Sequence, residues 1–277
     1  MGRAEKVSYR AGGGTSLAHR AHTVRVLAGT EYKLRYSGSA LGYFWSIAKP
    51  LAFFSVLYVV FGRALRFGVG IENYPLYLLL GVVLFTYFAD ATNSTVETLV
   101  NRSQLLRRLS FPRMIIPISV TVTVFITLCI NLVAVVVFVA AARVVPQLDW
   151  IAVVPLLLEL YLFVLGVSLI LSTLYVYFRD IRQIWEVLLQ ILFYAAPVIY
   201  PLQLLPSWGQ HLAFLNPITQ IMQDFRALVL DSEQAPTVAT VYGHSAMRLV
   251  PIATVLAIFA LGVAIFKSRE PWLAERV

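Results

Sequence analysis

Residues 101–117 read Asn-Arg-Ser-Gln-Leu-Leu-Arg-Arg-Leu-Ser-Phe-Pro-Arg-Met-Ile-Ile-Pro, a short basic interruption between two long apolar runs. Leucines and arginines are interspersed over residues 102–111, which predicts one short amphipathic helix. Pro112 ends this helix, because proline cannot continue the backbone hydrogen bonding. Such a segment is either a connector that positive charge holds at a membrane surface or a docking element for a partner protein.

The composition of the chain indicates a membrane protein. Of its 277 residues, 59% are hydrophobic and 13% are charged, and the mean hydropathy is +0.78. Soluble domains carry about 25% charged residues. The excess of 22 Lys and Arg over 14 Asp and Glu does not indicate nucleic acid, because the positions of the basic residues report membrane topology. The lone Cys129 excludes an internal disulfide and most metal sites.

Six apolar runs predict six transmembrane helices, since a helix needs about 20 residues to cross about 30 Å of hydrocarbon. The predicted spans are roughly 41–61, 74–95, 115–142, 151–178, 184–200 and 249–266. An even number of spans puts both termini on one side. With the termini inside, the inner segments hold 17 Lys and Arg and the outer segments 5, Arg226 among them. The positive-inside rule therefore predicts cytoplasmic termini and a cytoplasmic 101–117 segment.

Two segments outside the spans have recognisable character. Residues 12–16, Gly-Gly-Gly-Thr-Ser, lack the Gly-Lys pair and the flanking strand and helix of a phosphate-binding loop, so we interpret them as part of a flexible tail. Residues 17–35 predict an interfacial helix whose basic side chains face lipid head groups.

Residues 201–248 are too apolar for an ordinary loop and too rich in proline to cross the bilayer. We predict a re-entrant hairpin on the outer side, with short helices near 207–215 and 217–230. Asn216 is a good N-cap and Pro217 a favoured first helical residue. We interpret His211 and His244 as surface residues, because two distant histidines do not make a metal site.

Two helical faces are candidates for a translocation path. At 100° per residue, one face of the first span carries an aromatic stripe of Tyr43, Phe54, Tyr58 and Phe61. One face of the fifth span carries Glu186, Gln190, Phe193, Pro197 and Tyr200. A polar face is costly against lipid, and aromatic rings beside hydrogen-bonding groups suit the C–H faces of sugars. Plain packing between helices is the alternative, and it is the role we expect of Trp45 and Phe53 on the opposite side of the first span.

Three further acids lie within or beside the spans. Asp90, Glu97 and Glu159 could relay protons in a secondary transporter, but we favour structural pairing, for instance of Glu97 with Arg102. A proton-driven carrier would be expected to consist of two related halves, and no internal repeat stands out in the sequence. A membrane-embedded glycosyltransferase would need paired acids facing one cavity, and the loops carry no such pair.

Short stretches in a fixed order resemble the ABC-2 type permeases that export lipid-linked polysaccharides, namely the Wzm-type and TagG-type subunits for O-antigen, teichoic acid, capsule or cell-wall galactan. These stretches are 33–36 (Lys-Leu-Arg-Tyr), 41–45 (Leu-Gly-Tyr-Phe-Trp), 49–51 (Lys-Pro-Leu), Asn101, 105–107 (Leu-Leu-Arg), 111–112 (Phe-Pro), 178–181 (Phe-Arg-Asp-Ile), 197–200 (Pro-Val-Ile-Tyr) and 215–217 (Leu-Asn-Pro). None is diagnostic alone, and together they cover most of the chain.

The resemblance implies an all-α permease in the bacterial plasma membrane, working as a homodimer with two separate ATPase subunits. ATP and Mg²⁺ would be bound by the partner subunit, with no cofactor and no catalytic residue on this chain. The predicted 102–111 helix would be the coupling helix that enters a cleft of the ATPase, through Arg102, Gln104, Leu105, Leu106, Arg107, Arg108, Leu109 and Phe111.

The same resemblance lines the conduit with the first and fifth spans and rests the N-terminal helix beside the ATPase. The cargo it implies is an undecaprenyl-linked polysaccharide. The alternative within the superfamily is an ABC-2 permease for a drug or a lipid.

Overall fold

The computed structural model describes residues 24–30, 32, 42–102, 112–230 and 234–276. Every regular element in this part of the chain is helical. In order, the elements are α2 (Gly42–Leu57), η1 (Tyr58–Ala64), α3 (Tyr74–Val96), α4 (Thr98–Asn101), α6 (Ile115–Ala141), η2 (Leu148–Ala152), α7 (Val153–Tyr177), α8 (Ile181–Ala195), η3 (Leu202–Leu204), α9 (Ser207–Ala213), α10 (Pro217–Val229), α11 (Val238–Tyr242), η4 (Ser245–Arg248) and α12 (Leu249–Arg276).

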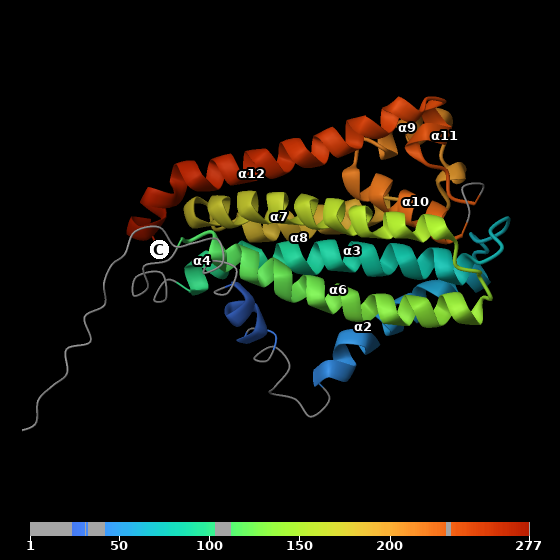
Figure 1. Ribbon diagram of the computed structural model, residues 1–277, viewed down its shortest axis with the longest axis horizontal. Coiled ribbons are helices and arrows are strands. Elements are labelled where there is room, and N and C mark those ends of the chain that lie inside the picture. The colour runs from blue at the N-terminus through green and yellow to red at the C-terminus, as the bar shows by residue number, and fades with distance from the viewer. Residues whose placement is uncertain (1–23, 31, 33–41, 103–111, 231–233, 277) are drawn as a thin grey trace, which may run out of the picture.

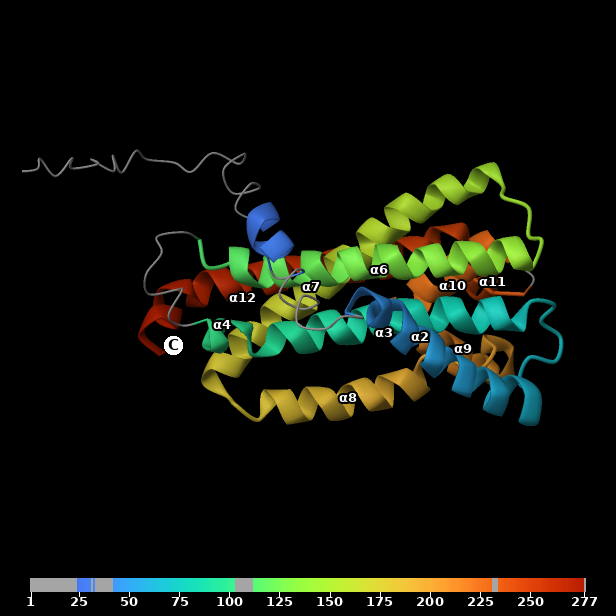
Figure 2. The same ribbon diagram turned by 90° about the horizontal axis from the view of Figure 1, so that it is seen from below.

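The long helices run side by side along the longest axis of the molecule (Figures 1 and 2). The short helix α4 and the end of α12 lie at one end, which we call the α4 end. The helices α9, α10 and α11 gather at the other, which we call the α9 end. Consecutive long helices alternate in direction between these two ends (Figure 2).

Within the residues that the structure describes, five helices are long and apolar enough to cross a membrane. They are Phe44–Ala64, Tyr74–Val96, Ile115–Ala141, Leu148–Tyr177 and Ser245–Glu270. These match five of the six predicted spans, so the prediction of an all-helical, multi-pass protein is confirmed. The remaining predicted span, 184–200, corresponds to α8, which has 15 residues and ends at Ala195. A helix of that length reaches about 22 Å.

The early end of α8 has a local cause in the sequence. Ala196 precedes Pro197, and a residue before proline is driven out of the helical region. Ala196 accordingly adopts extended backbone angles, with φ −78° and ψ 141°. The chain therefore leaves the helix four residues before the predicted boundary, and residues 196–201 are irregular.

The helix α3 is the hub of the bundle. Buried residues make up 78% of its most apolar window, against 22% for the first and last spans. A helix that is hydrophobic all round is expected in the interior. The helices α2, α6, α7 and α8 pack around it, whereas α12 packs on the outer side of α7.

The helices α7 and α12 cross in close contact through two glycines. A Cβ added to Gly262 would lie 2.4 Å from the carbonyl oxygen of Gly166, and one added to Gly166 would lie 2.7 Å from the Cα of Phe259. Small residues let membrane helices approach backbone to backbone. Any side chain at either glycine would therefore push these two helices apart.

A fully buried arginine closes the break after α8. The guanidinium of Arg226, on α10, donates to the carbonyl oxygens of Pro197 at 2.7 Å, Val198 at 2.8 Å and Tyr77 at 3.0 Å. It also lies 3.5 Å from the centre of the Tyr77 ring. Gly81 makes room, since a Cβ there would lie 2.2 Å from the guanidinium. Arg226 was counted among the charges of the outer segments, but its side chain is fully buried, where it satisfies carbonyl groups that have left a helix.

The two short helices predicted between residues 201 and 248 are present as α9 and α10. The side chain of Asn216 accepts a hydrogen bond from the backbone N–H of Ile218 at 3.2 Å, and Pro217 is the first helical residue. Both parts of the predicted cap are confirmed. His244 is exposed, and the ring of His211 packs edge-on against Tyr242.

The predicted interfacial helix 17–35 is described only in part. Residues 24–30 are helical and lie beside α6 (Figure 2). The hydroxyl of Thr123 on α6 donates to the carbonyl oxygen of Ala28 at 3.2 Å. Residues 17–23 and 33–35 lie outside the described part of the chain.

Replacing Arg226 with methionine should strongly destabilise the protein, because three buried carbonyl groups lose their donor. Removing one partner of a buried charged network costs about 3 to 5 kcal/mol. A loss of about 3 kcal/mol lowers Tm by roughly 6 to 12 °C in a protein of this size. The measurement is thermal unfolding of the detergent-purified protein. Arg143→Met, at an exposed arginine of the same half, is the matched control and should leave Tm nearly unchanged; equal shifts would contradict the bridging role.

Candidate functional site

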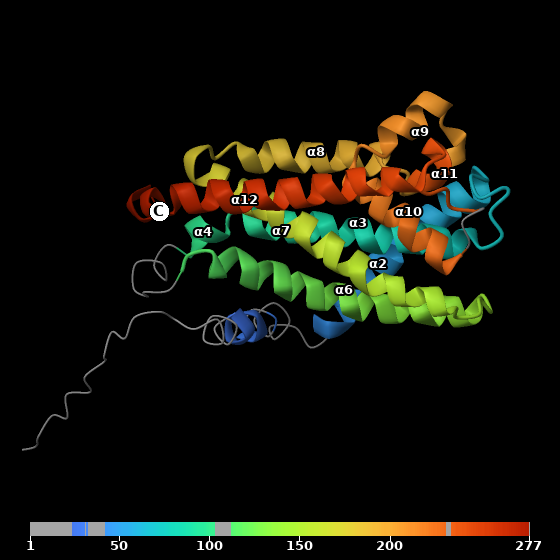
Figure 3. The same ribbon diagram turned by 45° about the horizontal axis from the view of Figure 1, so that its top comes forward.

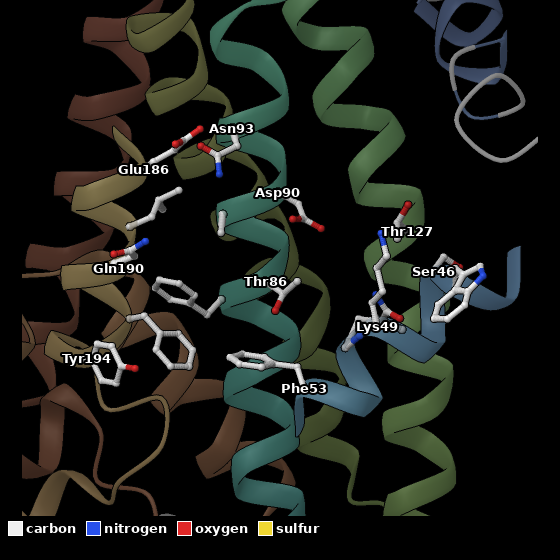
Figure 4. A pocket seen from close by; sticks show the side chains of 17 residues that line it. Ser46, Lys49, Phe53, Thr86, Asp90, Asn93, Thr127, Glu186, Gln190 and Tyr194 are labelled. Carbon is white, nitrogen blue, oxygen red and sulfur yellow. The ribbon is translucent and has the colours of Figure 1, made fainter. Parts of the chain in front are cut away.

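A cavity of about 1070 Å³ opens between α2, α3, α6 and α8 (Figure 4). The helices α2, α3 and α8 contribute both apolar and hydrogen-bonding side chains, and α6 contributes hydrogen-bonding side chains. The lining residues are Trp45, Ser46, Lys49, Pro50 and Phe53 of α2; Phe85, Thr86, Ala89, Asp90 and Asn93 of α3; Thr127 and Asn131 of α6; and Glu186, Leu189, Gln190, Phe193 and Tyr194 of α8.

The helix α8 forms one wall of this cavity. Glu186, Gln190 and Phe193 follow the i, i+4, i+7 spacing of one helical face, and the structure places all three on the cavity. Beyond the end of the helix, Pro197 is buried and Tyr200 is half-buried, outside the cavity lining. The Tyr200 hydroxyl donates to the carbonyl oxygen of Tyr194 at 3.0 Å.

The helix α2 meets the cavity through a different face from the predicted stripe. Phe53 is 44% exposed and lines the cavity, whereas Phe54 is 5% exposed and its ring lies edge-on 5.4 Å from Phe138 of α6. Tyr58 and Phe61 are half-buried and pack against the core. The backbone of Tyr43 is described, but its side chain lies outside the described part.

Two physical reasons explain this difference. The chain is π-helical over Tyr58–Ala64, so a projection at 100° per residue no longer holds there. Aromatic residues also occupy both sides of α2, so the pattern cannot decide which side faces inward. Trp45 and Phe53, which the projection assigned to packing, line the cavity instead.

Aromatic rings from three helices meet in the cavity. The ring of Phe193 on α8 lies 5.6 Å from Phe53 of α2 and 5.2 Å from Phe85 of α3, between ring centres. Tyr194 adds an exposed ring beside them. The cluster therefore joins the three helices across the cavity while leaving ring surface accessible.

The polar side chains surround these rings from several sides. Lys49 brings a positive charge, Asp90 and Glu186 bring acids, and Asn93 and Gln190 bring amides (Figure 4). Amides offer both donors and acceptors, so the cavity can hydrogen-bond a ligand that carries many hydroxyl groups. Rings and amides together suit a sugar, whose two faces are apolar and whose rim is polar.

One polar stripe of the site escaped the sequence reasoning. Thr86, Asp90 and Asn93 on α3 have the same i, i+4, i+7 spacing as the α8 residues. Asn131 and Thr127 repeat it in part on α6. Polar residues at helical spacing inside an apolar span would have indicated these faces.

Direct bonds tie α8 to its neighbours at the α4 end. Arg182 donates to the carboxylate of Glu97 at 2.7 Å, and the hydroxyl of Tyr175 donates to it at 3.0 Å. Further along α8, the indole N–H of Trp185 donates to the hydroxyl of Thr92 at 3.0 Å. Burial tends to raise the pKa of Glu97, but the hydrogen bonds from Arg182 and Tyr175 outweigh it and hold that pKa below its usual range. The expected structural pairing of Glu97 is confirmed, with Arg182 as a partner that the sequence reasoning missed.

The predicted coupling residues fall almost entirely outside the described part of the chain. Residues 103–111, with Gln104, Leu105, Leu106, Arg107, Arg108, Leu109 and Phe111, are not described. Arg102 follows α4 and is half-buried. On the returning side, the backbone N–H of Arg113 donates to the carboxylate of Glu270 at 3.1 Å, and its guanidinium donates to the Glu270 carbonyl oxygen. The 101–117 segment is thus tied to the end of α12.

Comparison with known proteins bears on the whole chain. An O-antigen export system permease protein of Klebsiella pneumoniae is 29% identical over 74% of this chain and 79% of its own length. One from Myxococcus xanthus is 27% identical over 89% and 92%. A polysialic acid transport protein of Escherichia coli is 22% identical over 90% and 93%. The ABC-2 type transporter family matches residues 22–230. That match covers most of the chain, so this chain belongs to the ABC-2 type transporter family.

Proposed function

We propose that this protein is the transmembrane permease of an ATP-driven exporter that moves a lipid-linked polysaccharide from the cytoplasm to the outer side of the bacterial plasma membrane. The observation that carries the proposal is the cavity between α2, α3, α6 and α8, where aromatic rings and amides meet. The relatives are named for O-antigen export or for polysialic acid transport, and these names favour a polysaccharide as the cargo over a drug or a lipid.

The chemistry of the cavity suits a polymer that must bind and then leave. Aromatic stacking is worth about 0.5 to 1.5 kcal/mol beyond area burial, which is enough to guide a sugar and too little to hold it. Phe53, Phe193 and Tyr194 offer such rings, and Gln190 and Glu186 offer hydrogen bonds beside them. The translocation path we propose therefore keeps the predicted α8 residues Glu186, Gln190 and Phe193. On α2 it runs along the face of Trp45, Lys49 and Phe53.

A closed conduit requires a second copy of the chain. Most residues of α8 are exposed, and the helices of a single chain border the cavity on one side only. Two copies related by a two-fold axis would bring two such half-cavities together. We propose a homodimer carrying two ATPase subunits.

The proposed topology follows from the ends of the bundle. The α4 end carries the basic 101–117 segment and the end of α12, so we assign it to the cytoplasm by the positive-inside rule. In this proposal α8 and the irregular residues 196–200 make the sixth crossing together. The helices α9 and α10 then form a re-entrant hairpin at the outer side, and both termini are cytoplasmic.

Coupling to ATP hydrolysis is assigned to residues 102–111. In this proposal the leucines Leu105, Leu106 and Leu109 enter a cleft of the ATPase, while Arg107 and Arg108 meet acidic groups at its rim. ATP and Mg²⁺ would be bound by that separate subunit. Movement of the segment would pass to α3 and α6, which flank it, and to α12 through the Arg113–Glu270 contact.

Loss of this protein from its host should trap a polyprenyl-linked glycan on the cytoplasmic side of the plasma membrane. Radiolabelled sugar should then accumulate in the lipid extract and fall in the cell-surface fraction. Restoring the wild-type chain should reverse both changes. A normal surface glycan, with an unchanged lipid-linked pool, would contradict polysaccharide export.

Replacing Phe53 with alanine should reduce export at nearly unchanged stability, because its ring is partly exposed in the cavity. Phe54→Ala is the matched control on the same helix. Its ring is buried against Phe138, so the change should lower the free energy of unfolding by about 3 to 5 kcal/mol. The two measurements are Tm of the purified protein and export in cells that lack the native chain. If Phe53→Ala lost stability as Phe54→Ala does and export followed stability alone, the cavity would not be the path.

Reversing the charge of Arg107 and Arg108 together to glutamate should weaken ATPase association without unfolding the membrane part. Exposed loop charges contribute little to folding, but they steer and register an interface. Copurification of the ATPase with a tagged permease measures the effect. The control is Arg66→Glu with Arg143→Glu, two exposed arginines near the α9 end. Normal copurification and export by the first double variant would mean that the segment is a connector only.

A further inference from the structure

A second cavity, of about 910 Å³, lies between α7, α10 and α12, none of which lines the first cavity. Figure 3 shows how these three helices are arranged. The walls of this cavity are mainly apolar and include Leu148, Ile151, Leu158 and Leu256, all of which are largely exposed on the outside of the bundle. Exposed leucine and isoleucine on a membrane helix face hydrocarbon. The cavity is therefore a groove between helices at the lipid-facing surface.

The floor of the groove carries oxygen atoms that lack hydrogen-bond donors. Gln220 is 3% exposed, and its side-chain N–H donates to the carboxylate of Asp224 at 2.7 Å. Among the described residues, the side-chain oxygen of Gln220 has no hydrogen-bond partner, and neither does one carboxyl oxygen of Asp224 or of Glu159. All three side chains line the groove. An amide oxygen can only accept hydrogen bonds, and so can a carboxylate when it is ionised, so a ligand that donates hydrogen bonds would satisfy this floor.

The rim of the same groove carries the opposite charge. Arg248 lies where η4 meets α12, and its side chain is exposed. It donates to the hydroxyl of Thr237 at 3.5 Å, which leaves most of its donors available to the groove. The groove thus combines an acidic, accepting floor, a basic rim and apolar walls.

We propose that this groove binds a phospholipid with a primary ammonium head group, of which phosphatidylethanolamine is the common example. The ammonium would donate to Glu159, Gln220 and Asp224, the phosphate would pair with Arg248, and an acyl chain would lie along the apolar walls. Rotation of either carboxyl group about its last bond turns one oxygen toward the groove. This site does not depend on which substrate the protein exports.

The arrangement of charges explains why this lipid fits better than others. An anionic head group such as phosphatidylglycerol brings no cation to the two acids, and its negative charge is repelled by them. Phosphatidylcholine carries the same charges as phosphatidylethanolamine, but its ammonium has no N–H to donate. A buried acceptor left without a donor loses the hydrogen bond it made with water, which weakens binding. Hydrogen bonding therefore distinguishes phosphatidylethanolamine from phosphatidylcholine, which charge alone would not do.

The test is native mass spectrometry of the purified protein with equal amounts of phosphatidylethanolamine, phosphatidylcholine and phosphatidylglycerol. Wild-type protein should retain phosphatidylethanolamine at least fivefold over each of the other two. Glu159→Gln combined with Asp224→Asn should reduce that preference to within twofold. The matched control is Asp180→Asn, at an exposed acid of the α4 end, and it should keep the wild-type preference.

A second variant tests the rim and does not touch the buried floor. Arg248→Gln should reduce retention of all three lipids, because each carries a phosphate, while the order of preference stays the same. This variant also decides the matter if the floor variant fails to fold. Wild-type protein without a preference for phosphatidylethanolamine would overturn the proposal, and so would Arg248→Gln with unchanged retention.

A second copy of the chain is the other possible occupant of the groove. Leu256→Cys, made in a Cys129→Ser background, places a thiol on the groove wall. If the lipid occupies the groove, this thiol should not cross-link to a second copy in native membranes. Efficient disulfide formation between two such chains would mean that the groove is a protein interface, and the proposal would fail.

Discussion

In the part of the chain that the structure describes, the hydrogen bonds of Arg226 hold together the break after α8, where the bundle leaves regular helix. Hydrocarbon offers no water to free carbonyl groups, so a broken helix persists only where protein satisfies it. Pro197 makes the break, and the guanidinium of Arg226 meets the released carbonyl groups of Pro197 and Val198 while Gly81 leaves space for it. The penalty of burying this charge is offset by four hydrogen bonds and the face of the Tyr77 ring. Without the arginine the carbonyl groups at the break would lack a donor, and without the break the guanidinium would lack acceptors. The break and the arginine therefore depend on each other.

This bridge also positions the site. The break ends α8, and α10 carries Arg226 back into the bundle, so the far end of α8 is fixed against α3 by the same contact that closes the hairpin. Its near end is fixed by Glu97 and Arg182, and its middle by Trp185 and Thr92. Attached along one side only, α8 keeps its other faces free, which is why a polar and aromatic wall remains open in a single protomer.

Sequence reasoning succeeded where a local property decides the structure. Five of the six spans predicted from run lengths are confirmed, and the Asn216-Pro217 pair predicted the start of α10. The amphipathic pattern of α8 predicted the face of Glu186, Gln190 and Phe193 that lines the cavity. It failed where partners are distant or the helical period changes. The π-helical turn from Tyr58 breaks the projection on α2, and Arg182 meets Glu97 from 85 residues away. The topology count placed Arg226 in an outer segment but did not predict its burial, because a count of arginines does not show that a proline break needs a hydrogen-bond donor.

The same packing indicates where the bundle can move. The helices α7 and α12 touch backbone to backbone at Gly166 and Gly262, so sliding one past the other would drive carbonyl oxygens into Cα atoms. They should therefore move as one body, together with the 101–117 segment that Arg113 ties to α12. By contrast most of α8 and about half of the described side chains of α2 are exposed. The contacts that hold α8 against α3 join side chains and not backbones, so they yield more readily than the contact between the two glycines. A push at the α4 end would then be absorbed at the α2 and α8 walls, which are the two walls that border the cavity.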